Sequence, residues 1–287
     1  MNLNLAEVEQ VVQQALAEDI GAGDITTALT VPPSSVSCAQ IVAREEGVIA
    51  GLEVAAMTFA LVADTYVAKK GSEVRFSPEV ADGTRVRPGE PVAVIVGPTA
   101  VILTAERTAL NFLQRMSGIA TKTARLIELV KHTGAKIVDT RKTAPGLRTL
   151  DKYAVRVGGG HNHRFGLYDA ILIKDNHIRA VGEIKEAVEA ARSSAPRAMR
   201  IEVEADSIEQ VKQALQAGAD TILLDNMSPA TLKEAVGLCK GRALTEASGN
   251  VTEETVAEIA ETGVDTISVG ALTHSVKALD LSLEIAS

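Results

Sequence analysis

The pattern of apolar and polar positions divides the chain into two parts with different periods. Near the start, Leu5, Val8 and Val12 recur at helical spacing, which predicts an amphipathic helix over residues 5–18. The turn-forming residues at 18–27 include two glycines and two aspartates, and they are expected to end that helix.

Between residues 36 and 96, short β-prone runs alternate with turns that contain glycine. Strands are predicted at 37–43, 63–69, 74–76 and 91–96, and a helix at 51–62. Residues 80–97 resemble a hairpin of biotinyl and lipoyl carriers. They lack the lysine at the hairpin tip that would bear the cofactor, so we expect a similar shape without a carrier function. This part is predicted to be a small domain of mixed α and β structure.

A longer helix is predicted from Thr104, because apolar residues return there at helical spacing. Gly118 is expected to end or bend this helix, and a second helix is expected over 121–131. Arg107 lies on a polar stripe of the first helix. Such a stripe can face solvent or line a cleft, and the spacing favours neither.

After residue 130 one sequence pattern recurs, in which a glycine is followed by a short apolar run and then by a polar residue. Strands are predicted at 134–139, 171–173, 201–203, 218–225, 243–245 and 263–270. Helices are predicted between them at 181–192, 207–217, 229–238 and 253–262, several after a capping residue such as Ser207, Ser228 or Thr252. Alternating strands and helices imply a parallel sheet. The unit repeats without a visible reversal, which favours a barrel with fewer than eight strands.

A parallel barrel places its chemistry at the carboxyl ends of its strands. Three kinds of group follow the predicted strands or lie near them: the cations Arg141, Lys142, Arg164 and Lys174, the carboxylates Glu204 and Asp225, and the small loops at Ser248-Gly249 and Gly270-Ala271. Cations suit an anionic substrate, carboxylates suit a hard metal ion or sugar hydroxyls, and loop N–H groups suit phosphate. Together they predict a substrate with carboxylates, a phosphate group and a metal ion.

Charge and composition narrow the class of protein. Residues 131–177 hold nine lysines and arginines against four aspartates, a local charge of +5 in a chain of net charge −8. This favours a pocket for a small polyanion over a nucleic-acid surface. Aromatic residues make up 2 %, so base stacking is not expected. Cys38 and Cys239 are expected to be buried thiols without metal-ligand spacing. With neither a signal sequence nor a membrane-length apolar run, the protein is expected to be cytoplasmic.

Several motifs, in their order and spacing, resemble the quinolinate phosphoribosyltransferase family, of the type II phosphoribosyltransferases. They lie at 23–27 (Gly-Asp-Ile-Thr-Thr), 105–111, 139–143 (Asp-Thr-Arg-Lys-Thr), 159–164, 173–177, 201–204 and 268–274. The resemblance runs nearly end to end. It implies an N-terminal α/β sandwich domain over 1–112, rejoined by 272–287, and an incomplete parallel α/β barrel of about seven strands over 113–271.

The same resemblance implies an activity. The family transfers the phosphoribosyl group of 5-phosphoribosyl 1-diphosphate to the ring nitrogen of quinolinate with Mg²⁺, releasing diphosphate and CO₂ and giving nicotinate mononucleotide for NAD synthesis. It also implies a homodimer with a shared site, in which Arg107 reaches in from the partner subunit. Assembly of dimers into hexamers is left open.

Roles for individual residues follow from the resemblance. Quinolinate is expected to bind Arg107, Arg141, His163, Arg164 and Lys174. The phosphoribosyl diphosphate is expected to bind Lys142, Glu204, Asp225, Ser248, Gly249, Gly270 and His274. Glu204 and Asp225 would hold Mg²⁺ directly or through water. Lys142 and Lys174 would flank the carbon that loses CO₂, and which of them returns the proton stays open.

The remaining polar residues of the window have simpler interpretations. His161 is expected to pack in a loop and His132 to lie on the surface, while Asn176 and His177 either cap a turn or line the site. One solvated helix face is expected to carry Arg148, Lys152 and Arg156. The alternative activity is transfer to nicotinate without decarboxylation. The presence of His163, Arg164 and Lys174 together favours the dicarboxylate.

Overall fold

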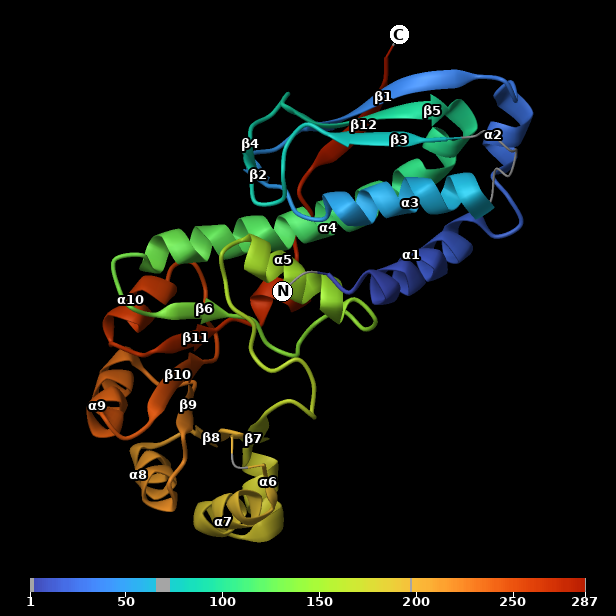
Figure 1. The fold of residues 1–287 in the computed structure, drawn as a ribbon. Helices are drawn as coiled ribbons and strands as arrows, with labels where there is room; N and C mark the ends of the chain where they lie inside the picture. Colours follow the sequence, from blue (N-terminus) through green and yellow to red (C-terminus); the bar gives the residue numbers. More distant parts are fainter. Residues whose placement is uncertain (1–2, 66–72, 197, 287) are drawn as a thin grey trace. The chain divides into compact units, whose positions relative to one another are not determined.

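The computed structural model describes residues 3–65, 73–196 and 198–286, and it forms two compact units (Figure 1). Unit 1 comprises Met1–Lys122, Ala144–Gly159 and Ser275–Ser287. Unit 2 comprises Thr123–Thr143 and Gly160–His274. Within the described ranges, no helix combines the length and the apolar character needed to cross a membrane.

A four-stranded antiparallel sheet forms the centre of unit 1, in the order β12-β1-β5-β3. Its strands are β1 (Val36–Ala43), β3 (Arg75–Pro78), β5 (Pro91–Pro98) and β12 (Leu281–Ile285). Alternate residues of β1, among them Ala39 and Ile41, are fully buried, as expected for a sheet with one face on a core. Because β12 pairs with β1, the last residues of the chain belong to this sheet.

Helices of unit 1 cover this core. They are α1 (Leu5–Ile20), α2 (Ile25–Thr30), α3 (Leu52–Thr65), α5 (Arg148–Val157) and the first part of α4 (Thr99–Val130). The predicted helices at 5–18 and 51–62 are confirmed as α1 and α3. The latter packs on α1 and β3 (Figure 1).

Three predictions for residues 18–97 are wrong. Residues 25–30 form α2 and not a turn, because the Asp24 side chain accepts the Thr27 N–H and caps a helix. Residues 63–65 end α3 and are not a strand, while 66–69 lie outside the described residues. The hairpin at 80–97 does not form: β4 (Arg85–Val86) pairs with β2 (Gly47–Val48), since β1 and β3 occupy both edges of β5.

Gly118 does not interrupt α4, contrary to prediction. Its role is a close approach: a Cβ at this position would lie 2.1 Å from the Lys277 carbonyl oxygen. Only a glycine lets the segment before β12 pass so near the helix.

Unit 2 is an incomplete parallel α/β barrel with the strand order β6-β11-β10-β9-β8-β7. The strands are β6 (Lys136–Val138), β7 (Ile171–Ile173), β8 (Ile201–Ala205), β9 (Thr221–Asp225), β10 (Leu244–Ser248) and β11 (Thr266–Ser268). All six lie where the recurring glycine pattern and the apolar runs predicted strands. In place of the seventh strand, the described residues contain a single parallel bridge between Val138 and His161.

Helices α6 (Asp175–Val181), α7 (Ile184–Ser194), α8 (Ile208–Ala217), α9 (Pro229–Cys239), α10 (Val256–Glu261) and α11 (Ala271–His274) complete unit 2. Contacts of α7 to α10 with the strands place these helices along the outside of the sheet (Figure 1). Ser207 and Ser228 cap α8 and α9 as predicted. Thr252 does not cap α10, because that helix begins only after Thr255.

Candidate active site

A cavity of about 600 Å³ opens at the carboxyl ends of the strands of unit 2. Nine of the residues predicted for the site line it: Arg141, Lys142, His163, Arg164, Lys174, Glu204, Asp225, Ser248 and Gly249. They come from six separate segments of sequence, and the barrel topology brings them together.

Two guanidinium groups form the most cationic wall of this cavity. Burial, and next the neighbouring charge of Arg141, lower the pKa of Arg164. The Arg164 side chain is held by a 3.2 Å hydrogen bond from Nη1 to the Ala170 carbonyl oxygen. Two like charges kept this close in a partly buried wall favour an anion between them.

Lys174 lies between a carboxylate and the start of a helix. Its Nζ is 2.8 Å from Glu204 Oε2, and its backbone N–H donates to His177 Nδ1 at 2.9 Å as α6 begins. The open question about His177 is therefore answered by the structure, since its ring caps α6. Lys174 brings its charge to the cavity with its ammonium already oriented by Glu204.

Asp225 ends β9, and the next loop fixes its position. Asn226 has φ of 52°, donates from Nδ2 to Asp225 Oδ2 at 2.8 Å, and donates its backbone N–H to the Ser248 carbonyl. Gly249 has φ of 99°, and a Cβ there would lie 2.1 Å from Asn226 Oδ1. Glycine is therefore required where the backbone of this loop meets Asn226.

Lys142 is held by α11 and by the glycine that precedes it. Its carbonyl accepts the Thr273 hydroxyl at 2.8 Å. A Cβ on Gly270 would lie 3.0 Å from the Lys142 side chain and 3.1 Å from the His274 ring. The predicted residues Gly270 and His274 thus adjoin Lys142, although they do not line the cavity itself.

The wall of the cavity includes part of a cluster that the sequence interpretation missed, formed by His163, Glu202 and Glu246, of which His163 and Glu246 line the cavity. His163 Nε2 is 3.1 Å from Glu202 Oε2 and 3.6 Å from Glu246 Oε2. Burial, and next the charge of Glu202, raise the pKa of Glu246 to about 7. The alternation in Ile201–Glu202–Val203–Glu204 was a usable signal, since it places both glutamates on one face of the strand.

Comparison with known proteins agrees with this geometry. A family model described as the N-terminal domain of quinolinate phosphoribosyl transferase matches residues 24–117, and the model of its C-terminal domain matches residues 119–284. The chain belongs to the quinolinate phosphoribosyl transferase family.

Relatives in this family match over almost their full length. A probable nicotinate-nucleotide pyrophosphorylase (carboxylating) of Bacillus subtilis is 44 % identical over 283 residues, which is 99 % of this chain and 95 % of the relative. The Mycobacterium leprae protein named nicotinate-nucleotide pyrophosphorylase (carboxylating) is 48 % identical, covering 96 % and 95 %. The solved structure of the nicotinate-nucleotide pyrophosphorylase from Francisella tularensis has a TM-score of 0.92 at 39 % identity, covering 99 % and 98 %. The predicted family and fold class are confirmed.

Not all predicted family residues lie in unit 2. Arg107 is an exposed residue of α4 within unit 1, and its predicted entry into a partner subunit's site stays a prediction.

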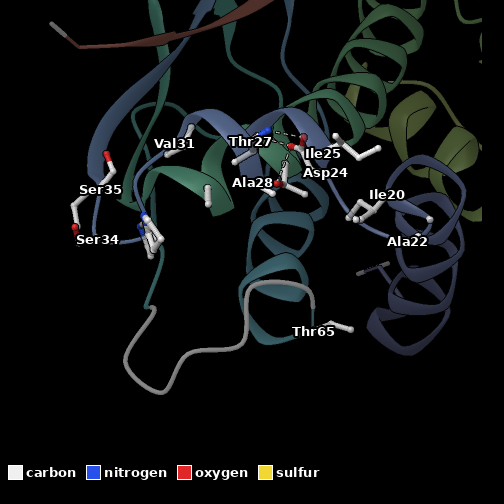
Figure 2. Close-up of a pocket in the computed structure, with 17 residues that line it drawn as sticks. Ile20, Ala22, Asp24, Ile25, Thr27, Ala28, Val31, Ser34, Ser35 and Thr65 are labelled. Atoms are coloured by element: carbon white, nitrogen blue, oxygen red, sulfur yellow. Dashed lines mark hydrogen bonds between the residues drawn. The ribbon is translucent and has the colours of Figure 1, made fainter.

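The family motif at 23–27 lines a different cavity, of about 850 Å³, within unit 1 (Figure 2). There Asp24 accepts hydrogen bonds from the Thr27 N–H and hydroxyl and from the Thr104 hydroxyl.

The simpler interpretations of the other polar residues have mixed outcomes. His132 is exposed beside Glu261, as predicted, and the side chain of His161 is exposed although its backbone bridges to β6. Lys152 is 2 % exposed, so a solvated face is wrong for it: it is one of the buried residues of α5, as are Leu150 and Asp151. Cys239 is buried as predicted. Cys38 is exposed, because it lies on the face of β1 opposite to Ala39.

Proposed function

We propose that the chain transfers the phosphoribosyl group of 5-phosphoribosyl 1-diphosphate to quinolinate, releases diphosphate and CO₂, and forms nicotinate mononucleotide for NAD synthesis. Relatives from Nicotiana glauca are named quinolinate phosphoribosyltransferase (decarboxylating), which supports this reaction. The observation that carries the proposal is the convergence of Arg141, Arg164 and Lys174 on one cavity that also holds Glu204 and Asp225.

Quinolinate has two adjacent carboxylates, which need several fixed cations when water is excluded. Arg141 and Arg164 suit this task, because guanidinium groups bind carboxylates with two parallel hydrogen bonds. Lys174 supplies a third charge, and Arg107 of the partner subunit a fourth. The family resemblance adds His163 to the set.

The sugar diphosphate is proposed to occupy the opposite side of the cavity. Lys142, Ser248, Gly249, Gly270 and His274 offer an ammonium group, a hydroxyl, backbone N–H groups and an imidazole to its phosphates. Glu204 on β8 and Asp225 on β9 offer carboxylate oxygens, the donor type that Mg²⁺ prefers. A bound Mg²⁺ would neutralise charge on the departing diphosphate.

The chain needs no side-chain nucleophile, because the pyridine nitrogen itself attacks C1 of the ribose as the bond to diphosphate breaks. The residues act by holding the two reactants in line and by stabilising charge. After transfer, the ring nitrogen is cationic, so the electron pair of the C2–carboxylate bond can remain on C2 as CO₂ leaves. Lys142 and Lys174 are the candidates to return a proton to that carbon.

Product analysis tests the function directly. The purified protein is incubated with the phosphoribosyl donor and Mg²⁺, together with either quinolinate or nicotinate. We expect nicotinate mononucleotide and one CO₂ per turnover with quinolinate, and no product with nicotinate. Turnover of nicotinate alone would contradict the proposal.

A homodimer with a shared site is proposed on the position of Arg107 in unit 1 and the family resemblance. Arg107→Ala and Lys174→Ala proteins, each inactive, are mixed under conditions where subunit exchange is demonstrated by mass spectrometry. Recovery of activity in the mixture supports sites built from two subunits, and no recovery despite exchange counts against them. The cytoplasmic location stays a prediction.

A further inference from the structure

The interior of the barrel contains two glutamates that the proposed reaction leaves without a role. Glu202 is two residues before Glu204 on β8, and Glu246 is two residues before Ser248 on β10, so each lies in the side-chain layer next to that of a residue predicted for the site, and Glu246 itself lines the cavity. Their exposed fractions are 9 % and 4 %. Parallel barrels usually fill this layer with branched apolar residues, and a buried carboxylate is costly without partners. Two carboxylates at this depth call for a function other than packing.

The hydrogen bonds of His163 determine which of its nitrogens carries a proton. The backbone N–H of Arg164 donates to His163 Nδ1 at 2.7 Å. An N–H group can only donate, so Nδ1 is the acceptor and has no proton. The proton of the ring is then on Nε2, which donates to Glu202 Oε2 at 3.1 Å with Glu246 Oε2 at 3.6 Å. In this arrangement His163 is a neutral imidazole with both nitrogens engaged by the protein.

The same residue is tied to its neighbours through the backbone. His163 N–H donates to Asp139 Oδ1 at 2.9 Å, and Asn162 Nδ2 donates to the other oxygen of that carboxylate. Asp139 is fully buried at the end of β6. The loop that carries Arg164 is therefore fixed at His163 by hydrogen bonds to two carboxylates, Asp139 and Glu202, with the Glu246 carboxylate 3.6 Å from Nε2.

We propose that Glu202 and Glu246 are positioning residues of the quinolinate site, which hold His163 as the Nε2–H tautomer so that its Nδ1 fixes the backbone of Arg164 at the cavity wall. The proposal rests on the proposed function for the identity of the ligand. It changes the part given to His163 by the family resemblance: the imidazole orients a cationic neighbour and brings no positive charge of its own. The charge on quinolinate is then met by Arg141, Arg164 and Lys174.

Nuclear magnetic resonance of the wild-type protein tests the tautomer without any substitution in the cluster. With ¹⁵N-labelled histidine, the His163 signals are assigned by their absence from a His163→Gln protein. We expect a protonated Nε2 and an unprotonated Nδ1. An imidazolium, or a proton on Nδ1, overturns the proposal. This measurement needs no substrate, so its result is independent of whether the proposed function holds.

Kinetics of paired substitutions test the positioning role. Glu202→Gln keeps the oxygen that accepts from Nε2 and Glu246→Gln keeps a polar oxygen beside it, whereas Glu202→Met and Glu246→Met keep the length of the side chain without an oxygen. We expect each methionine variant to raise KM for quinolinate about tenfold and to leave KM for the phosphoribosyl donor unchanged, with the glutamine variants near wild type. Equal effects of glutamine and methionine, or equal loss for both substrates, overturn the proposal.

The chain offers a matched control in the same unit. His132 Nε2 and Glu261 Oε1 form a second His–Glu pair at 3.3 Å, which is exposed and whose residues do not line the cavity. Glu261→Met should leave both KM values unchanged. If the buried methionine variants fail to fold, the wild-type spectrum decides the proposal alone. If the wild-type enzyme does not turn over quinolinate, the proposed function fails while the spectrum still tests the cluster.

Discussion

Unit 1 and unit 2 each contain a cavity with carboxylates in or beside its wall, and the two sets of carboxylates are held differently. Asp24 in unit 1 accepts three hydrogen bonds, and the bond from the Thr27 hydroxyl, followed by that from the Thr27 N–H, lowers its pKa. Glu246 in unit 2 has an oxygen, Oε1, that is buried without a hydrogen-bond partner among the described residues, and its pKa is raised to about 7.

The state of the carboxylates distinguishes a structural cavity from a binding cavity better than the volume of the cavity does. The cavity of unit 1 is the larger, at about 850 Å³ against about 600 Å³, yet its carboxylate is fully engaged in capping a helix. The smaller cavity gathers cations and carboxylates in one wall, and one of these carboxylates, Glu246, has a strongly raised pKa, which is typical of a binding site.

Removal of a cation from the wall of the smaller cavity should have the largest effect. We expect Arg141→Ala to lower kcat/KM for quinolinate by about 100-fold or more, because one partner of a desolvated charge pair is lost. Quinolinate binding is measured by calorimetry and the fold by circular dichroism. Arg242→Ala, which removes an exposed arginine of the same unit, serves as the control and should change neither. Unchanged quinolinate affinity in Arg141→Ala would exclude a role for Arg141 in the pocket.

The cations of this cavity were predictable from sequence because each follows an apolar run or a glycine turn. Arg141, Lys142 and Lys174 come directly after predicted strands, and the carboxyl ends of parallel strands meet at one rim. Glu202 and Glu246 were not found, because a glutamate in a strand is usually exposed and only its pairing with His163 shows otherwise. The alternation over residues 201–204 indicates the strand face of Glu202, but its partner His163 lies 39 residues away, so the local sequence does not indicate the pairing.

The elements of the fold also divide into those that local sequence predicts and those that depend on other parts of the chain. Strands of unit 2 were predictable because they contain short runs of apolar or β-branched residues, and several of these runs follow a glycine. The helix α2 was missed because Ile25–Thr30 has two β-branched threonines at its start, and its formation depends on the cap from Asp24. Gly118 was misjudged because its purpose, the passage of the Lys277 backbone, depends on a segment more than a hundred residues away.

The raised pKa of Glu246 predicts a dependence of stability on pH. The folded state binds this proton more tightly than the unfolded state, in which the pKa of the glutamate is 4.5. The contribution of Glu246 to the free energy of unfolding is therefore most favourable below pH 4.5 and is lost as pH rises to about 7. Glu246→Gln removes this titration. We expect the variant to gain up to about 3 kcal/mol over wild type at pH 8, and no gain at pH 4.5. Urea unfolding at both pH values measures the difference, and an equal gain at both would contradict the assignment.

The engaged carboxylate of unit 1 should behave in the opposite way. We expect Asp24→Ala to cost about 1 kcal/mol of unfolding free energy at pH 7, because α2 loses its N-terminal cap. Since the pKa of Asp24 is lowered from 3.8, the loss should disappear as pH falls below that value. Asp24→Ser keeps a capping oxygen and is the control. A large loss of kcat/KM in Asp24→Ala with unchanged stability would show that the larger cavity takes part in the reaction.

The two cysteines extend the comparison to reactivity, where the smallest effect is expected. Cys38 on β1 of unit 1 is exposed, whereas Cys239 on α9 of unit 2 is buried, and burial raises the pKa of the Cys239 thiol. Because the thiolate is the reactive form, iodoacetamide should modify Cys38 in the folded protein and leave Cys239 unmodified. Intact-mass analysis should show one adduct in buffer and two in urea. Two adducts in buffer would mean that α9 opens in the folded state, and the helices around the smaller cavity would then be less rigid than the proposed positioning of Arg164 requires.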